Sequence, residues 1–171
     1  QVRLHYEIPT RGLIGFSTAF MTTTKGYGII NHTYKEYKAL TGGSYGERVM
    51  GVLVSMENGK ASAYALNAIE DRGILFIEPG VDIYEGMVVG ENAYNSDLAV
   101  NPVKEKHLTN MRAAGKDHTS VLKRPKKFSL ETALDYLNSD ELLEVTPKSF
   151  RIRKKILNMN DRKKAEFKSK V

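Results

Sequence analysis

The sequence predicts an α+β fold: a partial ferredoxin-like β-α-β unit, then a β-rich, barrel-like domain with one docked helix and a long basic loop. Three observations support this class. Residues 3–37 place a helical apolar pattern between two strand-like stretches. Residues 48–94 break into short apolar runs separated by Gly and Pro. Residues 101–127 have no apolar periodicity and end on a cluster of Lys and Arg, which is typical of a long cationic loop.

The first element is a strand over residues 3–8, where apolar and polar side chains alternate. Pro9 ends this strand, and Thr10 is a suitable N-cap for the helix that follows. That helix runs from Arg11 to about Lys25, because its apolar residues recur at helical spacing. A second strand over residues 27–37 completes the β-α-β unit.

The β-rich part begins with a buried strand over residues 48–56. Asn58-Gly59 follows, and Asn-Gly favours a two-residue hairpin turn, which predicts a partner strand over residues 61–66. Asn67–Arg72 is expected to form a short helix or turn. Short strands then follow at 74–77, 81–84 and 87–94. Their length and spacing predict a small barrel or a curled sheet.

Beyond the basic loop, Ser129 is a suitable N-cap for a helix over residues 130–138 with one apolar face. A short helical turn is expected over residues 140–143. Residues 149–155 alternate and predict a strand. Side chains on one face of a strand are about 6.6 Å apart. That face would carry a row of three cations: Arg151, Arg153 and Lys155. A polar helix beginning near Asn160 closes the chain.

Charge is distributed unevenly along the 171 residues, whose net charge is +6. Residues 1–100 hold 8 Lys/Arg and 11 Asp/Glu, a net of −3, whereas residues 101–171 hold 18 and 9, a net of +9. This asymmetry predicts a polyanionic partner for the second part, whether RNA, DNA or an anionic membrane. The absence of cysteine and of an apolar run near 20 residues fits a cytoplasmic protein.

Catalytic and metal motifs are weak. Residues 41–46 are glycine-rich, but Glu47 follows Gly46 where a phosphate-binding loop needs Lys. The four histidines have no metal-ligand spacing, so we expect no metal site and no cofactor in this chain. The residues of a Ser-His-Asp site come together only in the folded chain, so their spacing in the sequence does not reveal them. A small hydrolase is therefore an open alternative.

Four specific motifs follow one another along the chain: PTRGLIGF at 9–16, YEGMVVG at 84–90, LTNMRAAG at 108–115 and VTPKSFRIRKK at 145–155. Together they resemble the C-terminal part of the BipA/TypA family of ribosome-binding translational GTPases. The resemblance implies that residues 1–38 are half of a unit like domain V of elongation factor G, and that residues 39–171 are the family-specific C-terminal domain. It also implies that the GTPase domain, with its GTP and Mg²⁺, is absent from this chain, so the chain is not an enzyme.

The resemblance further implies binding near the ribosomal A site, contacts with large-subunit ribosomal RNA and the acceptor end of A-site tRNA, and a link to large-subunit assembly and stress adaptation. The expected RNA contacts are cationic: Arg112, Lys116, Lys123, Arg124, Lys126, Lys127, Lys148, Arg151, Arg153, Lys154, Lys155, Arg162, Lys163 and Lys164. The alternatives are a solvated basic loop, or a protein-interaction module that docks an acidic partner.

The half domain should also have open sheet edges, because the family's complete sheet places a further strand between the two expected here. An unpaired strand edge is a site for pairing with another chain. We therefore expect residues 3–8 and 27–37 to pair with each other, to pair with another copy, or to be poorly ordered. A closed four-stranded sheet would contradict this.

Overall fold

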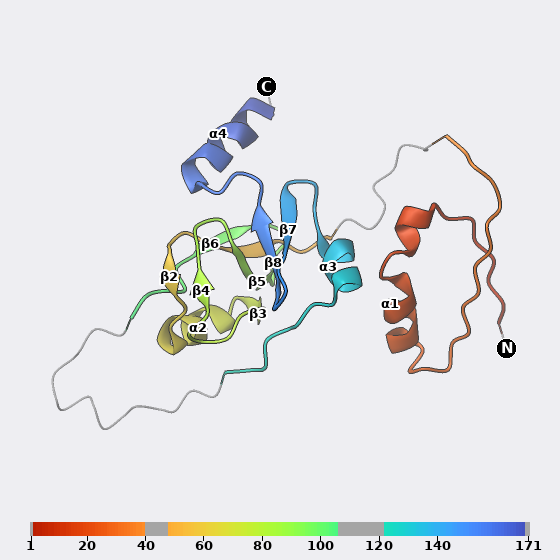
Figure 1. The fold of residues 1–171 in the computed structure, drawn as a ribbon, viewed down its shortest axis with the longest axis horizontal. Coiled ribbons are helices and arrows are strands. Elements are labelled where there is room, and N and C mark those ends of the chain that lie inside the picture. The colour runs from red at the N-terminus through yellow and green to blue at the C-terminus, as the bar shows by residue number, and fades with distance from the viewer. Residues whose placement is uncertain (1, 40–47, 106–121, 170–171) are drawn as a thin grey trace.

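The computed structural model describes residues 2–39, 48–105 and 122–169. Figure 1 shows α1 and its flanking segments on one side of a sheet-centred body, next to α3. The elements in chain order are a 3-10 helix η1 (Thr10–Leu13), α1 (Phe16–Thr23), β1 (Val52–Ser55), β2 (Gly59–Lys60), α2 (Ala63–Glu70), β3 (Gly73–Leu75), β4 (Asp82–Ile83), β5 (Val88–Asn92), β6 (Leu98–Val100), α3 (Leu130–Tyr136), β7 (Glu141–Val145), β8 (Phe150–Lys154) and α4 (Met159–Ser169).

The body is built on a four-stranded sheet with the order β3-β5-β1-β6. Strand β1 is antiparallel to β5, with a register shift between Leu53 and Val54, and parallel to β6. Two separate antiparallel pairs, β2–β4 and β7–β8, stand beside this sheet. A single bridge between Met87 and Arg153 joins β8 to the chain just before β5. The β7–β8 hairpin is therefore attached to the sheet at one point of its backbone.

Both faces of β1 are buried, because its alternate side chains enter two different apolar clusters. Leu53 packs in one cluster with Leu66 of α2 and with Val89. Val52 and Val54 pack on the opposite face in a second cluster that includes Tyr136 of α3 and Ile152 of β8. Since α2 covers one face and α3 with the hairpin covers the other, the sheet forms the middle layer of the body.

The α+β class is confirmed, and so are the helix capped by Ser129, the strand at 150–154 and the final helix. Barrel-like closure is not found among the described strands, since the central sheet is open and has β3 and β6 at its edges. Segment 122–128 approaches one of these edges, where the backbone N–H of Lys126 donates to the Leu75 carbonyl at 2.9 Å. None of the described helices is long and apolar enough to cross a membrane.

The hairpin predicted at Asn58-Gly59 is wrong. Residues 63–70 form α2, and β2 pairs with β4 instead. The Ser62 hydroxyl accepts a hydrogen bond from the Ala65 N–H at 3.0 Å, which caps the new helix. The stretch AYALNAIE is rich in good helix formers, so local propensity outweighs the turn signal.

Two elements of the sheet system are also missing from the sequence-based prediction. Residues 141–145 form β7 rather than a helical turn, because pairing with β8 satisfies their backbone over five residue pairs. Strand β6 is a three-residue segment held by parallel pairing with β1. Strand β6 depends on a partner far along the chain, which local patterns do not reveal. Strand β7 pairs with the next strand, and its short ELLEV segment fits a helical turn as well as a strand.

The N-terminal unit contains its predicted helix but not its predicted strands. Gly15 separates η1 from α1 in a left-handed conformation (φ 75°), and a Cβ at this position would lie 2.6 Å from Asp135 of α3. The segments before and after α1 are extended, but no backbone hydrogen bond joins residues 2–9 to residues 27–39. The Glu7 carboxylate instead links them by ion pairs to Lys35 and Lys38. Without hydrogen-bonded partner strands, the alternation of apolar and polar residues does not by itself produce a β-strand.

Candidate nucleic-acid interface

The β7–β8 hairpin presents the predicted row of cations. Ile152 faces the core, so its neighbours Arg151 and Arg153 lie on the opposite face of the strand. The Arg153 Nε lies 3.0 Å from a Glu144 oxygen, whereas Arg151 has no carboxylate partner within the described part of the chain. Lys155 lies one residue past the end of β8, and its side chain is exposed. The row is therefore two residues long on the strand, with Lys155 continuing it from the following loop.

Lys154 differs from the other predicted contacts because it lies in the interior. It is 2% exposed, and its Nζ is 2.5 Å from Asp97, 2.6 Å from Asp140 and 3.0 Å from Glu141. An ammonium surrounded by three carboxylates is not available to a phosphate, so we remove Lys154 from the expected RNA contacts. The strand's alternation carries the signal for this correction, since Lys154 shares a face with buried Ile152.

Arg48 is a second cation with a buried side chain, and no local sequence pattern singles it out. Its Nη1 and Nη2 donate to the two Glu141 oxygens at 3.1 and 2.8 Å, and Nη1 also donates to the Tyr136 carbonyl at 3.0 Å. The side chains of Arg48 and Glu141 are 7% and 0% exposed. A planar guanidinium matches a carboxylate in this bidentate way, which a lysine cannot reproduce.

Both buried cations remain charged. Burial lowers the pKa of Lys154, but its hydrogen bonds to Asp140 and Asp97 and the charge of Glu141 outweigh burial and raise the pKa above its ordinary value. Burial likewise lowers the pKa of Arg48, and the hydrogen bonds and charge of Glu141 raise it overall. Glu141 is thus the shared anion of a buried network that joins Arg48 to Lys154.

Tyr136 connects this network to the basic segment. The Arg48 guanidinium lies 4.3 Å from the centre of the Tyr136 ring, and the Lys126 Nζ lies 5.1 Å from it. The ring also packs edge-on against Phe76 and beside Phe128. Burial raises the pKa of the Tyr136 hydroxyl, so the ring stays neutral at physiological pH. Two cations therefore share one buried aromatic ring.

The basic segment itself, residues 122–128, lies beside β3. Besides the Lys126 backbone bond to Leu75, the Lys123 N–H donates to a Glu70 oxygen at 2.7 Å. The four cations of this segment are exposed but not equivalent. Lys126 and Lys127 form ion pairs of 3.4 and 3.2 Å with Glu91 and Glu78. In the described part of the chain, the side chains of Lys123 and Arg124 pair with no carboxylate.

The remaining predicted contacts divide in the same way. Lys148 and Lys163 are exposed and, among the described residues, form no ion pair. Lys164 lies 3.4 Å from Asp161, and Arg162 donates back to the carbonyls of Ile156 and Leu157. Arg112 and Lys116 lie outside the described residues. Among the predicted contacts that the structure describes, those without a carboxylate partner and free to meet a polyanion are therefore Lys123, Arg124, Lys148, Arg151, Lys155 and Lys163.

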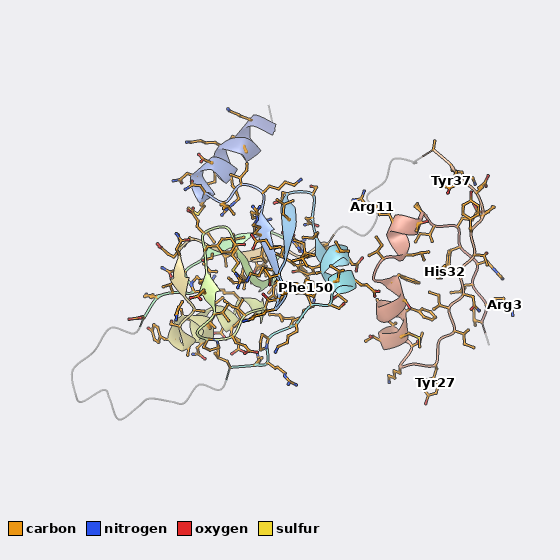
Figure 2. The ribbon with its side chains drawn as sticks, in the orientation of Figure 1. Arg3, Arg11, Tyr27, His32, Tyr37 and Phe150 are labelled. Atoms are coloured by element: carbon orange, nitrogen blue, oxygen red, sulfur yellow. The ribbon has the colours of Figure 1, made fainter. Side chains whose placement is uncertain are left out.

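Exposed aromatic side chains accompany the N-terminal unit. Tyr27 is 89% exposed, and Figure 2 shows Tyr27 and Arg3 pointing away from α1. The rings of Tyr34 and Tyr37 contact each other at a tilt of 57°, with their centres 5.2 Å apart. The described residues include no group of three or more His, Asp or Glu side chains that could hold a metal ion. These surfaces therefore offer cationic and aromatic side chains to a partner.

Known proteins match the whole length of this chain. The chain is 55% identical over 171 residues to the large ribosomal subunit assembly factor BipA of Bacillus subtilis, covering all of this chain and 28% of that protein. It is 50% and 49% identical over 165 residues to proteins of the same name from Haemophilus influenzae and Salmonella typhimurium, covering 96% of this chain and 27% of each relative. The chain thus spans little more than a quarter of the length of these relatives.

Two family models match, and both describe C-terminal domains. The elongation factor G C-terminus matches residues 1–48. The TypA/BipA C-terminal domain matches residues 50–159, which include the central sheet, the β7–β8 hairpin and the buried network. Because that second model covers well over half of the 171 residues, the chain belongs to the TypA/BipA family and carries its C-terminal domain.

Proposed function

We propose that this chain is the non-catalytic, ribosome-binding part of a translational GTPase and that it contacts RNA through its cationic surfaces. The printed names of its relatives support the ribosome as partner, since each is a large ribosomal subunit assembly factor. The net charge of +9 over residues 101–171 supports a polyanionic surface on that partner. In this proposal GTP and Mg²⁺ bind elsewhere in the parent protein, which acts in the cytoplasm.

The observation that carries the proposal is the set of unpaired cations around the β7–β8 hairpin. Lys148, Arg151 and Lys155 are held on or beside a strand whose other face is buried, and none forms an ion pair among the described residues. An arginine or lysine without an internal carboxylate can neutralise a phosphate and release its counterions. A rigid strand also fixes the spacing between the cations, which costs less ordering entropy than a free loop.

The finer parts of the proposal follow the family resemblance. We propose large-subunit ribosomal RNA and the acceptor end of A-site tRNA as the contacts of residues 101–127 and 148–164, with roles in large-subunit assembly and stress adaptation. Arg112 and Lys116 remain proposed contacts, as do Lys123, Arg124, Lys126 and Lys127. We also propose the domain division 1–38 and 39–171.

The direct test is ribosome co-sedimentation of the chain at several salt concentrations. Each lost phosphate contact should reduce the slope of log affinity against log salt by about one. The triple change Lys148→Gln, Arg151→Gln, Lys155→Gln should therefore flatten the slope by about three and leave the fold intact. The matched control is the triple change Arg11→Gln, Lys25→Gln, Lys60→Gln, which alters three exposed cations that lie outside the proposed contacts and form no ion pair among the described residues. A triple variant that retains the wild-type slope would remove the hairpin from the interface.

The alternative is a module that docks an acidic protein. One observation favours it: Lys126 and Lys127 already bind carboxylates, those of Glu91 and Glu78. The four changes Lys123→Ala, Arg124→Ala, Lys126→Ala and Lys127→Ala separate the two functions. Loss of binding to purified ribosomal RNA supports the RNA proposal, whereas unchanged RNA binding with lost binding to polyglutamate supports the alternative.

Self-association is a further part of the proposal. The extended residues 2–8 and 27–37 carry exposed apolar side chains and have no backbone hydrogen bonds to each other. A second copy could pair with these open edges. Sedimentation of the chain over a range of concentrations tests it.

A further inference from the structure

A continuous chain of contacts joins the two cationic surfaces. It begins at Lys126 in the basic segment and passes through the Tyr136 ring to Arg48, at distances of 5.1 and 4.3 Å from the ring centre. From Arg48 it continues through Glu141, the shared carboxylate, to Lys154 of β8, with nitrogen–oxygen distances of 2.8 and 3.0 Å. Lys154 follows Arg153 on the strand whose outer face carries the proposed RNA contacts.

Arg48 is the central member of this chain of contacts. Its Nε donates to the Met50 carbonyl at 2.6 Å, its two terminal nitrogens hold Glu141, and its flat face covers Tyr136. It therefore contacts α3, β7 and the segment just before β1 with one side chain. A lysine at this position would keep the charge and lose both the fork and the stacked face.

The backbone alone holds the hairpin loosely. Among the described residues, one bridge, Met87 to Arg153, joins β8 to the central sheet system. The hydrogen bond from the Lys154 N–H to the Gly86 carbonyl, at 2.9 Å, is part of this same bridge. The angle of the hairpin relative to the rest of the body thus depends on side chains. These are the apolar cluster that contains Ile152 and Tyr136, and the ion pairs that join Arg48 to Glu141 and Lys154 to Asp97.

We propose that Arg48 is a positioning residue for RNA binding. It fixes the basic segment 122–128 and the β7–β8 hairpin relative to each other, so that one RNA engages both cationic surfaces at once. This inference rests on the proposed function. When two surfaces bind together, the second contact is intramolecular, and affinity exceeds that of either surface by about 10²–10⁴-fold. That gain in affinity is lost when the two surfaces are no longer held in a fixed relative position.

The test compares Arg48→Lys with Arg72→Lys, the same change at an exposed arginine. The chain has no cysteine, so spin labels at Lys127→Cys and Lys148→Cys report the distance between the two surfaces in the free protein. We expect Arg48→Lys to broaden this distance distribution and Arg72→Lys to leave it unchanged. An unchanged distribution in Arg48→Lys would overturn the proposal, and this measurement does not depend on RNA.

The second readout is affinity for purified ribosomal RNA, without spin labels. Arg48→Lys should weaken binding by about 10- to 100-fold although it removes no exposed charge. A double-mutant cycle between Lys123→Gln/Arg124→Gln and Arg151→Gln/Lys155→Gln should show an interaction term in the wild-type background and none in Arg48→Lys. A merely structural residue would leave that term in place. A wild-type chain that binds no RNA would refute the proposed function, while the distances would still test the positioning role.

A second variant guards against loss of the fold. Tyr136→Leu removes the ring between Lys126 and Arg48 but leaves Arg48, Glu141 and Lys154 intact. Slow amide exchange at Leu53 and Val89, in the buried centre of the sheet, shows that a variant is folded. If Arg48→Lys loses the protection from amide exchange, the Tyr136→Leu variant provides the test. A broadened distance between the two spin labels with a protected core would support the proposal. A wild-type distance distribution would overturn it.

Discussion

The body and the N-terminal unit each contain a stretch whose apolar pattern predicts a strand, with opposite outcomes. In the body, β1 has a strand on each side, and all four of its residues are buried. In the N-terminal unit, residues 2–8 alternate between apolar and polar side chains, yet Leu4 is 66% exposed, whereas Leu53 of β1 is 0% exposed. The difference teaches that alternation specifies which side chains share a face, while burial needs partners for both the backbone and that face.

The same comparison holds for charge. Glu141 and Glu7 are each the common anion of two cations, Arg48 and Lys154 in one case and Lys35 and Lys38 in the other. The side chain of Glu141 is 0% exposed and that of Glu7 is 62% exposed. Exposed ion pairs are screened by water and contribute little, whereas removing one member of a buried network leaves uncompensated charges. Ion pairs of similar composition therefore contribute very differently to the stability of the fold.

The largest expected effect comes from removing the two glutamates in turn. Glu141→Ala should lower the free energy of unfolding by about 3–5 kcal/mol, because Arg48 and Lys154 lose their shared counterion in a buried site. Glu7→Ala should leave the unfolding midpoint unchanged. Urea unfolding followed by circular dichroism measures both. Equal effects of the two changes would mean that the buried network has no special role in stability.

A smaller effect is expected from truncating one leucine in each region. Leu66→Ala should cost about 2–5 kcal/mol, because it opens a cavity between α2 and the sheet. Leu4→Ala removes a side chain that is already exposed and should leave the midpoint of unfolding where it is. Urea titration of the two variants beside the wild-type protein checks this. A marked loss of stability in Leu4→Ala would show that residues 2–8 are covered in solution.

The sequence predicts the elements of the fold that depend on local signals. Ser129 caps α3 through its hydroxyl, which accepts the Thr132 N–H at 3.3 Å, and this capping residue is recognisable in isolation. The alternation of residues 149–155 locates β8 to within one residue at either end. Strand β6 escapes prediction because its stability comes from pairing with distant β1. Strand β7 escapes it because its apolar pattern is too short to separate a helical turn from a strand. The Asn58-Gly59 turn misleads because the helix after Ser62 competes with it.

The candidate site shows the same limit. Sequence identifies which residues are cationic and which face of β8 they occupy, but it does not show where carboxylates meet them. Lys154 and Lys155 are adjacent in sequence, yet the first is surrounded by Asp97, Asp140 and Glu141 and the second is exposed. Arg48 could not be singled out, because its partner Glu141 lies 93 residues away. Ion pairs between residues far apart in sequence can be identified only when the fold is known.

The smallest expected effect is a difference in pH dependence between two lysines whose pKa values are raised for the same reason. Glu36 and Glu7 raise the pKa of exposed Lys38, and Asp140, Asp97 and Glu141 raise that of Lys154 against the opposing effect of burial. A group whose pKa is higher in the folded state stabilises the protein below its unfolded pKa, which for lysine is about 10.4. That stabilisation disappears as the pH rises through the folded pKa.

Wild-type stability should therefore decline above about pH 10, by at most about 1.4 kcal/mol per pH unit for one proton. Tyr84 and Tyr136 add to this decline, because burial raises the pKa of each hydroxyl and only their unfolded forms ionise readily. Lys154→Met keeps the tyrosine contribution and should show a shallower alkaline decline, while Lys38→Met should follow the wild-type curve. Urea midpoints at pH 8 to 11 measure the three slopes. A Lys154→Met slope equal to wild type would mean that the ammonium remains as well stabilised in the unfolded chain, which would separate Lys154 from the buried network.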